Sequence, residues 1–517
     1  MSKSSRGRWW ISPIVALGLG GVAWPASAQP GGNEAEARPS SEAASPAAEQ
    51  PEPAAEPKQA AQDIYADLEP IADDDKREVP DYDGRGGDPV DAADVALWVP
   101  RIVFSPVYVV SEYVIRWPLG KLVTAAEKND LPALMVDFFT FGPEKKAGIV
   151  PTALIDFGLR SSIGFYFFWD DYIADGQDFR LRAATGGSHW FLVNAAHRTW
   201  IDEPQDTSAE ARFEYSRRPD WEYHGLGPTA PDEAESEYEA QRIEGGVRFR
   251  SRYWRTSSVE TYLAVRDVRF WESGDLDDGD VHIGNRVAQG FYPYPPGWDD
   301  GYTIFLQRAE ASLDTRELRD THVGDGSDFV SPPGTGLRLA LRGQLAEGLR
   351  ATPRLTYNGP DRHYFVTYGG TLGGFLDLNQ KQRVIGLSAI VDFADPLVDG
   401  SEIPFTELAS LGGARPLRGF LERRLLGRSA VAWRFEYRWP VWVWLDGAAH
   451  YTVGNVFGKH LEGFEAGLLR QSFGLGIRSI AARDHAFEVL LAFGTKPFDE
   501  GGTVDNVRFV LGTTGGF

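Results

Sequence analysis

The chain has 517 residues and a formal net charge of -22, and this excess of acidic side chains argues against nucleic acid as a partner. Aromatic residues make up 13% of the chain, more than a soluble core needs, whereas the mean hydropathy of -0.31 excludes a bundle of membrane helices. A transmembrane β-barrel reconciles a polar average with many aromatic residues. The sequence contains no Cys, which fits an oxidising envelope compartment.

Residues 1–28 predict a secretory signal peptide. Basic residues up to Arg8 precede an apolar stretch from Trp9 to Trp24, and Ala26-Ser27-Ala28 provides the small residues of a cleavage site. The alternative is a single membrane anchor, but the apolar stretch is short and interrupted by Pro and Gly. We expect the mature chain to begin at Gln29, with no later apolar run of about 18 residues that could span a bilayer as a helix.

Two further segments precede the predicted barrel. Residues 29–91 are rich in Ala, Pro, Glu, Asp and Gly, and they predict a disordered acidic tether because they hold too few large apolar side chains to offset the chain entropy. Spacing across the periplasm and docking of a basic partner are alternative roles. Residues 92–147 are apolar but interrupted by Pro, and they predict a short periplasmic segment at the barrel mouth or the inner-membrane surface.

Residues 148–517 are predicted to form an all-β, transmembrane antiparallel barrel of about 16 strands. Apolar and polar residues alternate in short segments separated by polar loops, and one parity is kept from Ala153 to Trp169. Further strands before the C-terminal group are predicted at Phe179–Thr185, Trp190–Arg198, Ala211–Ser216, Ile243–Trp254, Ser258–Phe270, Tyr302–Asp314, Gly336–Gln344, Leu349–Tyr357, His363–Tyr368 and Arg383–Asp392.

The five C-terminal segments alternate most regularly. Val431–Trp439 places aromatic and aliphatic residues on one face and Arg434, Glu436 and Arg438 on the other. In a soluble sandwich the apolar face would be the core, whereas in a membrane barrel it meets lipid and the charged face lines the lumen. One strand alone leaves both open. The chain ends at Phe517, and a terminal aromatic residue after a last amphipathic strand is typical of barrel closure in outer-membrane proteins.

Leu417-Arg418-Gly419-Phe420 resembles the VRGF/Y motif of the BamA/TamA outer-membrane assembly family, which includes the bacterial surface antigen barrels. Tyr223–Gly227 is similar to the family's aromatic-x-G-I/L-G stretch, and Leu425–Val441 is similar to its E-Y-R-x-P strand. The resemblance covers roughly Ile149 to Phe517. It implies a sixteen-stranded barrel with a long external loop folded into the lumen. At the tip of this loop, Gly419 would allow a turn that side chains forbid.

The resemblance also implies that Arg418 binds acidic groups on the inner wall. Glu436 lies on the charged parity, and Trp444–Ala448 is similar to the family's F-x-D-x-G wall motif, with Trp in place of Phe and the final Gly shifted. An arginine in a narrow lumen needs carboxylate partners, so we expect Arg418 to bind Glu436 and Asp446. The alternative is a solvated Arg418, with Glu436 paired only to its neighbouring arginines.

The function that the resemblance implies is insertion or translocation of protein, less readily lipid, at the outer membrane of a Gram-negative bacterium. The partners would be outer-membrane lipid and unfolded β-barrel or secreted clients. Family members of this kind usually carry periplasmic POTRA domains, and residues 92–147 are too short and Pro-rich for one. A passive surface antigen or narrow pore is the alternative, and a membrane-embedded hydrolase is a third.

No catalytic, cofactor or metal site is predicted. Ser188 and His189 are adjacent and would face opposite ways on a strand, so they do not form a relay. His450 shares the parity of Asp446, but a polar lumen lining is the simpler interpretation. The acidic runs 275–280 and 325–328 lack a full calcium-ligand register and are interpreted as solvated loops.

Overall fold

The structure is a computed structural model, and it describes only part of the chain. The described residues are 138–142, 144–202, 206–274, 281–299, 301–316, 334–350, 363–378, 382–414, 416–442, 445–479 and 487–513. The predicted signal peptide, the tether, and residues 92–137 of the predicted periplasmic segment lie outside them. Among the described residues, no helix has both the length and the apolar character needed to cross a bilayer.

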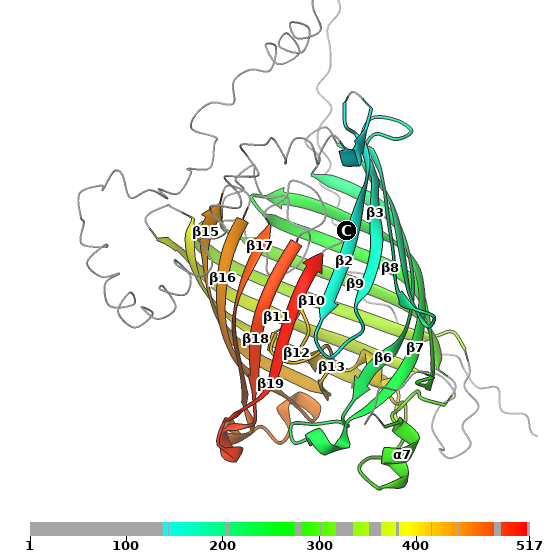
Figure 1. The fold of residues 1–517 in the computed structure, drawn as a ribbon, viewed down its shortest axis with the longest axis vertical. Coiled ribbons are helices and arrows are strands. Elements are labelled where there is room, and N and C mark those ends of the chain that lie inside the picture. Colours follow the sequence, from blue (N-terminus) through cyan, green and yellow to red (C-terminus); the bar gives the residue numbers. More distant parts are fainter. Residues whose placement is uncertain are drawn as a thin grey trace, which may run out of the picture. The chain divides into compact units, whose positions relative to one another are not determined.

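Sixteen antiparallel strands close into a barrel, as predicted (Figure 1). Each strand pairs with the next, β12 pairs with β15, and β19 closes the circle on β2. The strands are β2 (Ala147–Asp156), β3 (Ser162–Trp169), β4 (Gln177–Gly187), β5 (Trp190–Trp200), β6 (Thr207–Tyr223), β7 (Ser236–Trp254), β8 (Ser257–Glu272), β9 (Tyr302–Asp314), β10 (Gly336–Gly348), β11 (Tyr364–Leu378), β12 (Arg383–Pro396), β15 (Ser429–Trp442), β16 (Leu445–Phe457), β17 (Arg470–Ser479), β18 (Phe487–Thr495) and β19 (Val504–Thr513).

The remaining elements are short. A two-residue strand, β1 (Thr140–Phe141), pairs with β2, and β13 (Ala409–Leu411) pairs with β14 (Leu425–Gly427) in a separate small sheet. The helical turns are η3 (Asp232–Ala234), α7 (Ile283–Ala288), η4 (Phe405–Glu407), η5 (Lys459–Leu461), η6 (Ala466–Leu468) and η7 (Phe498–Glu500).

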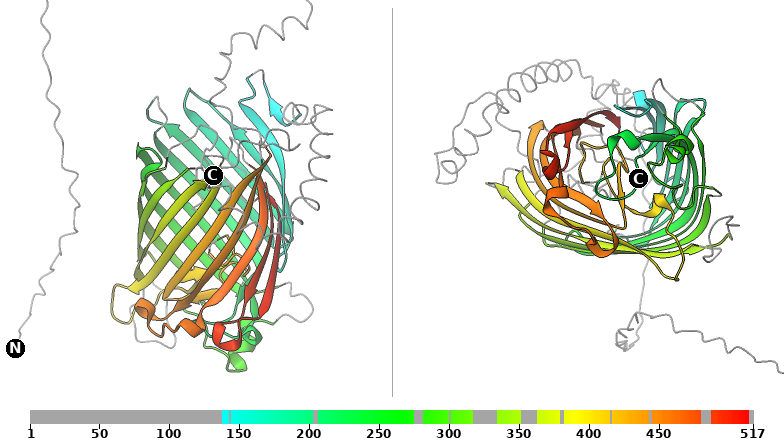
Figure 2. Two further views of the ribbon diagram at one scale, coloured as in Figure 1. Left: turned by 90° about the vertical axis from the view of Figure 1, so that its left-hand side faces the viewer. Right: turned by 90° about the horizontal axis from the view of Figure 1, so that it is seen from below.

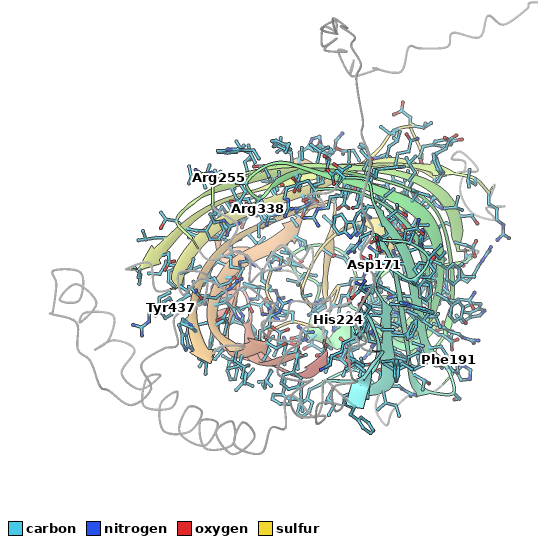
Figure 3. The ribbon with its side chains drawn as sticks, turned by 90° about the horizontal axis from the view of Figure 1, so that it is seen from above. Asp171, Phe191, His224, Arg255, Arg338 and Tyr437 are labelled. Carbon is cyan, nitrogen blue, oxygen red and sulfur yellow. The ribbon has the colours of Figure 1, made fainter. Side chains whose placement is uncertain are left out.

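The side chains of the barrel wall reverse the pattern of a soluble protein, since apolar residues are exposed and charged residues are buried. On β15 the apolar Trp433 and Phe435 are 42% and 37% exposed, whereas Arg434 between them is 5% exposed. Figure 3, a view down the barrel, shows Phe191 at the outer side of the wall. A soluble protein buries its apolar parity, so this reversal means that the apolar face of Val431–Trp439 points outward and its charged face into the lumen.

Connections between antiparallel neighbours alternate between the two ends of the barrel. One end has short turns, such as residues 255–256 between β7 and β8. The other end, called the long-loop end here, carries residues 224–235, 273–301 and 397–428, and Figure 2 (right) is a view from this side. Long loops on the external face are typical of bacterial barrels. β9 ends and β10 begins at the short-turn end as well, and most of the residues between them lie outside the described residues.

Most strands differ in length from the prediction; β6, for example, extends from Thr207 to Tyr223, and β11 from Tyr364 to Leu378. The stretch of one parity from Ala153 to Trp169 divides into β2 and β3, because the chain turns at Gly158, whose φ of +93° is a left-handed conformation that favours glycine. β10 continues to Gly348, beyond the predicted end at Gln344. Leu349 and Arg350 are not in a strand, and the rest of the predicted strand to Tyr357 lies outside the described residues.

The outward parity predicts how charges on the wall affect stability. Leu491 lies in the middle of β18 and is 43% exposed, so we expect Leu491→Arg to lower the free energy of unfolding in phospholipid vesicles by about 2–4 kcal/mol. Val504 is 50% exposed and begins β19 at the long-loop end, where the same substitution should cost about 0–1 kcal/mol. Urea titration measures both values, and equal costs would contradict the assignment of the lipid face.

Candidate functional site

Residues 397–428, called the lumen loop here, connect β12 to β15 and fold into the barrel. Their apolar side chains pack against inward-facing residues of the wall. This buried cluster contains Ala409, Leu411, Leu417, Phe420 and Leu425 of the loop with Ala430, Ala432 and Val456 of β15 and β16. The loop therefore packs inside the barrel, against β15 and β16.

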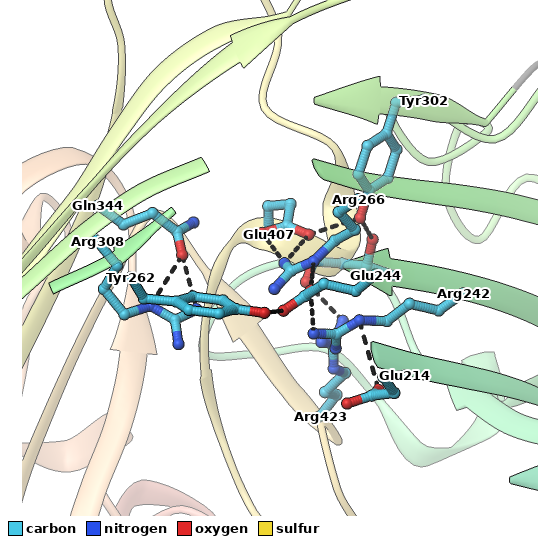
Figure 4. Close-up of polar contacts among 11 residues, drawn as sticks. Glu214, Arg242, Glu244, Tyr262, Arg266, Tyr302, Arg308, Gln344, Glu407 and Arg423 are labelled. Atoms are coloured by element: carbon cyan, nitrogen blue, oxygen red, sulfur yellow. Dashed lines mark hydrogen bonds and ion pairs between the residues drawn. The ribbon is translucent and has the colours of Figure 1, made fainter. Parts of the chain in front are cut away.

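The first anchor of the lumen loop is Glu407, at the end of η4. Its carboxylate accepts two hydrogen bonds from Nη1 of Arg266 on β8, at 2.6 and 2.8 Å, and one from the Tyr302 hydroxyl on β9 at 2.7 Å (Figure 4). Arg266 also donates to Glu244 on β7 at 2.5 Å, so its buried guanidinium lies between two carboxylates. Because a buried charge is costly without such partners, this network fixes η4 to the wall.

An aromatic cluster surrounds the same anchor. Phe405 of η4 lies 4.9 to 5.4 Å, centroid to centroid, from the rings of Tyr223, Tyr238 and Phe270 on β6, β7 and β8. Phe405 is fully buried. Aromatic pairs at these separations stabilise beyond the area that they bury, so the loop is held here by apolar as well as ionic contacts.

The second anchor is the tip of the lumen loop. Arg418 donates to Glu488 on β18 at 2.6 Å, and the backbone N–H of Gly419 donates to Ser472 Oγ on β17 at 2.8 Å. A Cβ on Gly419 would lie 2.1 Å from the carbonyl oxygen of Phe493, so the wall leaves no room for a side chain. The left-handed residue of the tip is Leu417, with φ of 68°; Gly419 instead allows the close approach of two backbones.

Arg508 on β19 connects the tip to the point where the barrel closes. Its guanidinium donates to both carboxylate oxygens of Asp156 on β2, at 2.8 and 2.6 Å. It also donates to the carbonyl oxygens of Gly413, at 2.8 Å, and Arg418, at 3.2 Å. One side chain therefore links the first strand, the last strand and the lumen loop.

The seam between β2 and β19 is short within the described residues. Its ladder has three paired positions, Val510 with Asp156, Leu511 with Ile155 and Gly512 with Leu154. The neighbouring β18–β19 ladder extends from Phe487 to Thr495. The seam therefore has fewer backbone contacts than the adjacent strand pair.

The part of the lumen loop that leads from the tip back to β15, called the return arm here, is bound by the connection between β6 and β7. The N–H of Gly227 donates to the carbonyl of Leu426 at 2.8 Å, and Arg424 donates to Asp232 and to the carbonyl of Ala230. Gly227 has φ of +100°, a conformation that favours glycine. The stretch Tyr223–Gly227 is thus placed beside the loop.

Two of the predicted site residues, Arg418 and Glu436, form ion pairs, and each has its own partners. Arg418 forms its ion pair with Glu488, which the sequence analysis did not select. Glu436 forms ion pairs with Arg438, at 2.9 Å, and Arg434, at 3.5 Å. Phe420 is fully buried at the tip. Asp446 is the second residue of β16, opposite Pro440 and Arg478. Phe517 lies outside the described residues, and the locking role of the set stays a prediction.

Two residues that bind the lumen loop, Glu488 and Arg508, were not predicted, although a weak signal was present for each. Glu488 and Arg508 lie on the polar parity of β18 and β19, where every charged residue is a candidate for the lumen. The alternation of polar residues does not identify which of them contacts the tip of the lumen loop. That choice depends on the path of the loop and on the height of each residue in the wall.

The described residues form a closed barrel with an anchored lumen loop and a short seam, and this is the architecture of an outer-membrane β-barrel. Residues 175–514 match the Omp85 superfamily domain, and the chain belongs to this superfamily. No curated protein sequence matches the chain.

Solved structures show a similar barrel at low sequence identity. BamA from Haemophilus ducreyi lacking POTRA domains 1-3 is similar with a TM-score of 0.46, 14% identity, and coverage of 71% of this chain and 70% of that one. CdiB from Acinetobacter baumannii gives 0.41, 10%, 71% and 59%, and CdiB from Escherichia coli gives 0.43, 10%, 71% and 63%. The chain thus spans less than two thirds of either CdiB chain.

The ion pair at the tip can be tested by a double-mutant cycle. The Arg418 and Glu488 side chains are only 18% and 10% exposed, so we expect Arg418→Ala or Glu488→Gln to lower the free energy of unfolding by about 3 kcal/mol, because each leaves a buried charge unpaired. The double variant should lose less than the sum of the two. Glu422→Gln is the matched control, since Glu422 is exposed on the same loop.

Urea unfolding in detergent measures these free energies. A gel assay of heat-modifiability gives a second readout, because a barrel with a loosened loop should unfold at a lower temperature. Additive single effects, or wild-type behaviour of Arg418→Ala on the gel, would contradict the locking role.

Proposed function

We propose that this protein inserts or translocates proteins at the outer membrane, in the manner of the BamA/TamA type. Its clients would be unfolded β-barrel or secreted proteins. Membership of the Omp85 superfamily and the short seam between β2 and β19 support this proposal. The mechanism is non-covalent. Residues 1–28 are removed on export, residues 29–147 lie in the periplasm, and the barrel occupies the outer membrane.

The short seam is the observation that carries the proposal. β2 is paired along Ala147–Leu154 with β3, whereas its other edge pairs, within the described residues, with β1 at Ala147 and Gly148 and with β19 at Leu154, Ile155 and Asp156. An exposed strand edge offers unpaired N–H and C=O groups to another chain. A client strand that adds to this edge would gain main-chain hydrogen bonds before its own barrel is complete.

The lumen loop would keep the barrel intact while the seam opens. Arg508 bonds the seam through Asp156 and the loop through the carbonyls of Gly413 and Arg418. If the β2–β19 ladder separates, β19 remains tied to the tip, which is itself bound to β17 and β18. Opening would therefore be local to the seam.

A disulfide across the seam tests the proposal directly. The mature chain from Gln29 is reconstituted into liposomes, and the folding rate of a denatured barrel client is measured. Ile155→Cys with Leu511→Cys joins two paired positions of the seam, and the chain has no Cys of its own. We expect the oxidised variant to lose the acceleration of client folding and reductant to restore it, because β2 is no longer free to accept a client strand.

The matched control places the same bond between β17 and β18, at the paired positions Leu475→Cys and Leu491→Cys. This control should accelerate client folding as the wild type does. Arg418→Ala should lose the acceleration if the loop supports it. A well-folded wild-type barrel that does not accelerate folding would overturn the proposal, and conductance in a planar bilayer would then identify a pore.

A further inference from the structure

Three potential metal ligands meet at the long-loop end, beside the connection from β6 to β7. Glu222 is the second-last residue of β6, His224 follows the strand, and Glu235 directly precedes β7. One ligand atom from each lies within 4.8 Å of the other two, and His224 Nε2 lies 3.5 Å from Glu235 Oε2. Neither the lumen loop anchors nor the seam uses this cluster.

These separations suit a single metal ion. Ligands bound at about 2.0–2.2 Å in a tetrahedron lie roughly 3.4 Å from one another. The contact between His224 and Glu235 already has this spacing. Glu235 is the most exposed of the three, with 47% of its side chain accessible, so rotation about its own bonds can bring it closer to Glu222.

His224 provides an independent reason to expect a ligand. Its side chain is buried; Nε2 has only the 3.5 Å contact to Glu235, and Nδ1 has no hydrogen-bond partner among the described residues. A buried polar atom without a partner is costly, so the protein leaves binding capacity of this imidazole unused.

The charges around the cluster permit a cation. Arg424 and Arg286 are nearby positive groups; the guanidinium of Arg424 is paired with Asp232, and that of Arg286 donates to the Glu235 carbonyl and to the Gln289 side chain. Glu222 and Glu235 would supply two negative charges to the ion. The exposed side of Glu235 gives an ion a route from the external solution.

We propose that Glu222, His224 and Glu235 bind a divalent transition-metal ion, Zn²⁺ in the first place, at the external rim of the barrel. One imidazole nitrogen and two carboxylate oxygens form a donor set that suits Zn²⁺, whereas Ca²⁺ and Mg²⁺ take shells of oxygen alone. Three protein ligands leave a fourth position for water. This inference is independent of the proposed function.

Metal binding would reinforce the lumen loop from outside. The ion would join the end of β6 to the start of β7 and so fix the connection between them. That connection holds the return arm of the loop through the Gly227–Leu426 hydrogen bond and the Arg424–Asp232 ion pair. An ion that binds only the folded state should therefore raise the temperature at which the barrel unfolds.

Zinc binding by the full chain tests the proposal. The protein is folded in detergent without a polyhistidine tag, treated with a chelator and titrated with Zn²⁺ against a zinc-binding dye. We expect one strong site per chain, and a weakening of about 10-fold or more in Glu235→Gln or Glu222→Gln, because each loses a ligand. Glu233→Gln is the matched control, since Glu233 is exposed in the same helical turn and outside the cluster.

Heat-modifiability confirms that each variant is folded and gives the second readout. Zn²⁺ should raise the unfolding temperature of the wild type and of Glu233→Gln, but not of Glu235→Gln. The proposal is overturned if the wild type binds no Zn²⁺ stoichiometrically, if Glu235→Gln binds it as tightly as the wild type, or if Ca²⁺ displaces it at equal concentration.

Discussion

The guanidinium of Arg508 joins three parts of the chain that lie far apart in the sequence: β2 through Asp156, β19 by its own backbone, and the lumen loop through two carbonyl groups. A β-barrel has no free edge only if its first and last strands stay together. Here the backbone ladder at that point is short, so a charge-assisted pair supplements it. Closure of the wall and position of the loop thus depend on the same side chain.

The interior is built on the opposite principle from a soluble core. Charged residues face inward, and many of them are stable there because carboxylates lie at hydrogen-bonding distance from a guanidinium, as Glu244 and Glu407 do from Arg266. Removal of one member of such a set leaves the others buried and unpaired. The lumen loop supplies charged partners for residues of the wall, with Glu407 paired to Arg266 and Arg418 paired to Glu488. The charged residues of the loop and of the wall therefore stabilise one another.

Much of the fold could be predicted because its main signal is local. Alternation along β15 to β19 identifies each strand and its lumen parity, and this needs no knowledge of neighbours. The boundary at Gly158 was missed because the residues on both sides keep one parity through the turn. The partner of Arg418 could not be chosen from sequence, since Glu436 and Glu488 share the lumen parity. Strand register and the path of the loop distinguish them, and both are set by contacts between distant residues.

The order in which the chain can assemble follows from the sequence distance of its contacts. Asp156 and Arg508 are 352 residues apart, and Arg266 and Glu407 are 141 apart. Hairpins such as β7–β8 can form as soon as both strands exist, but the closing pair requires the whole barrel sequence and gains nothing until then. The edges of β2 and of the growing sheet stay unpaired for most of the folding reaction. Such a barrel must therefore be protected from edge-to-edge association until its own last strand is available to pair.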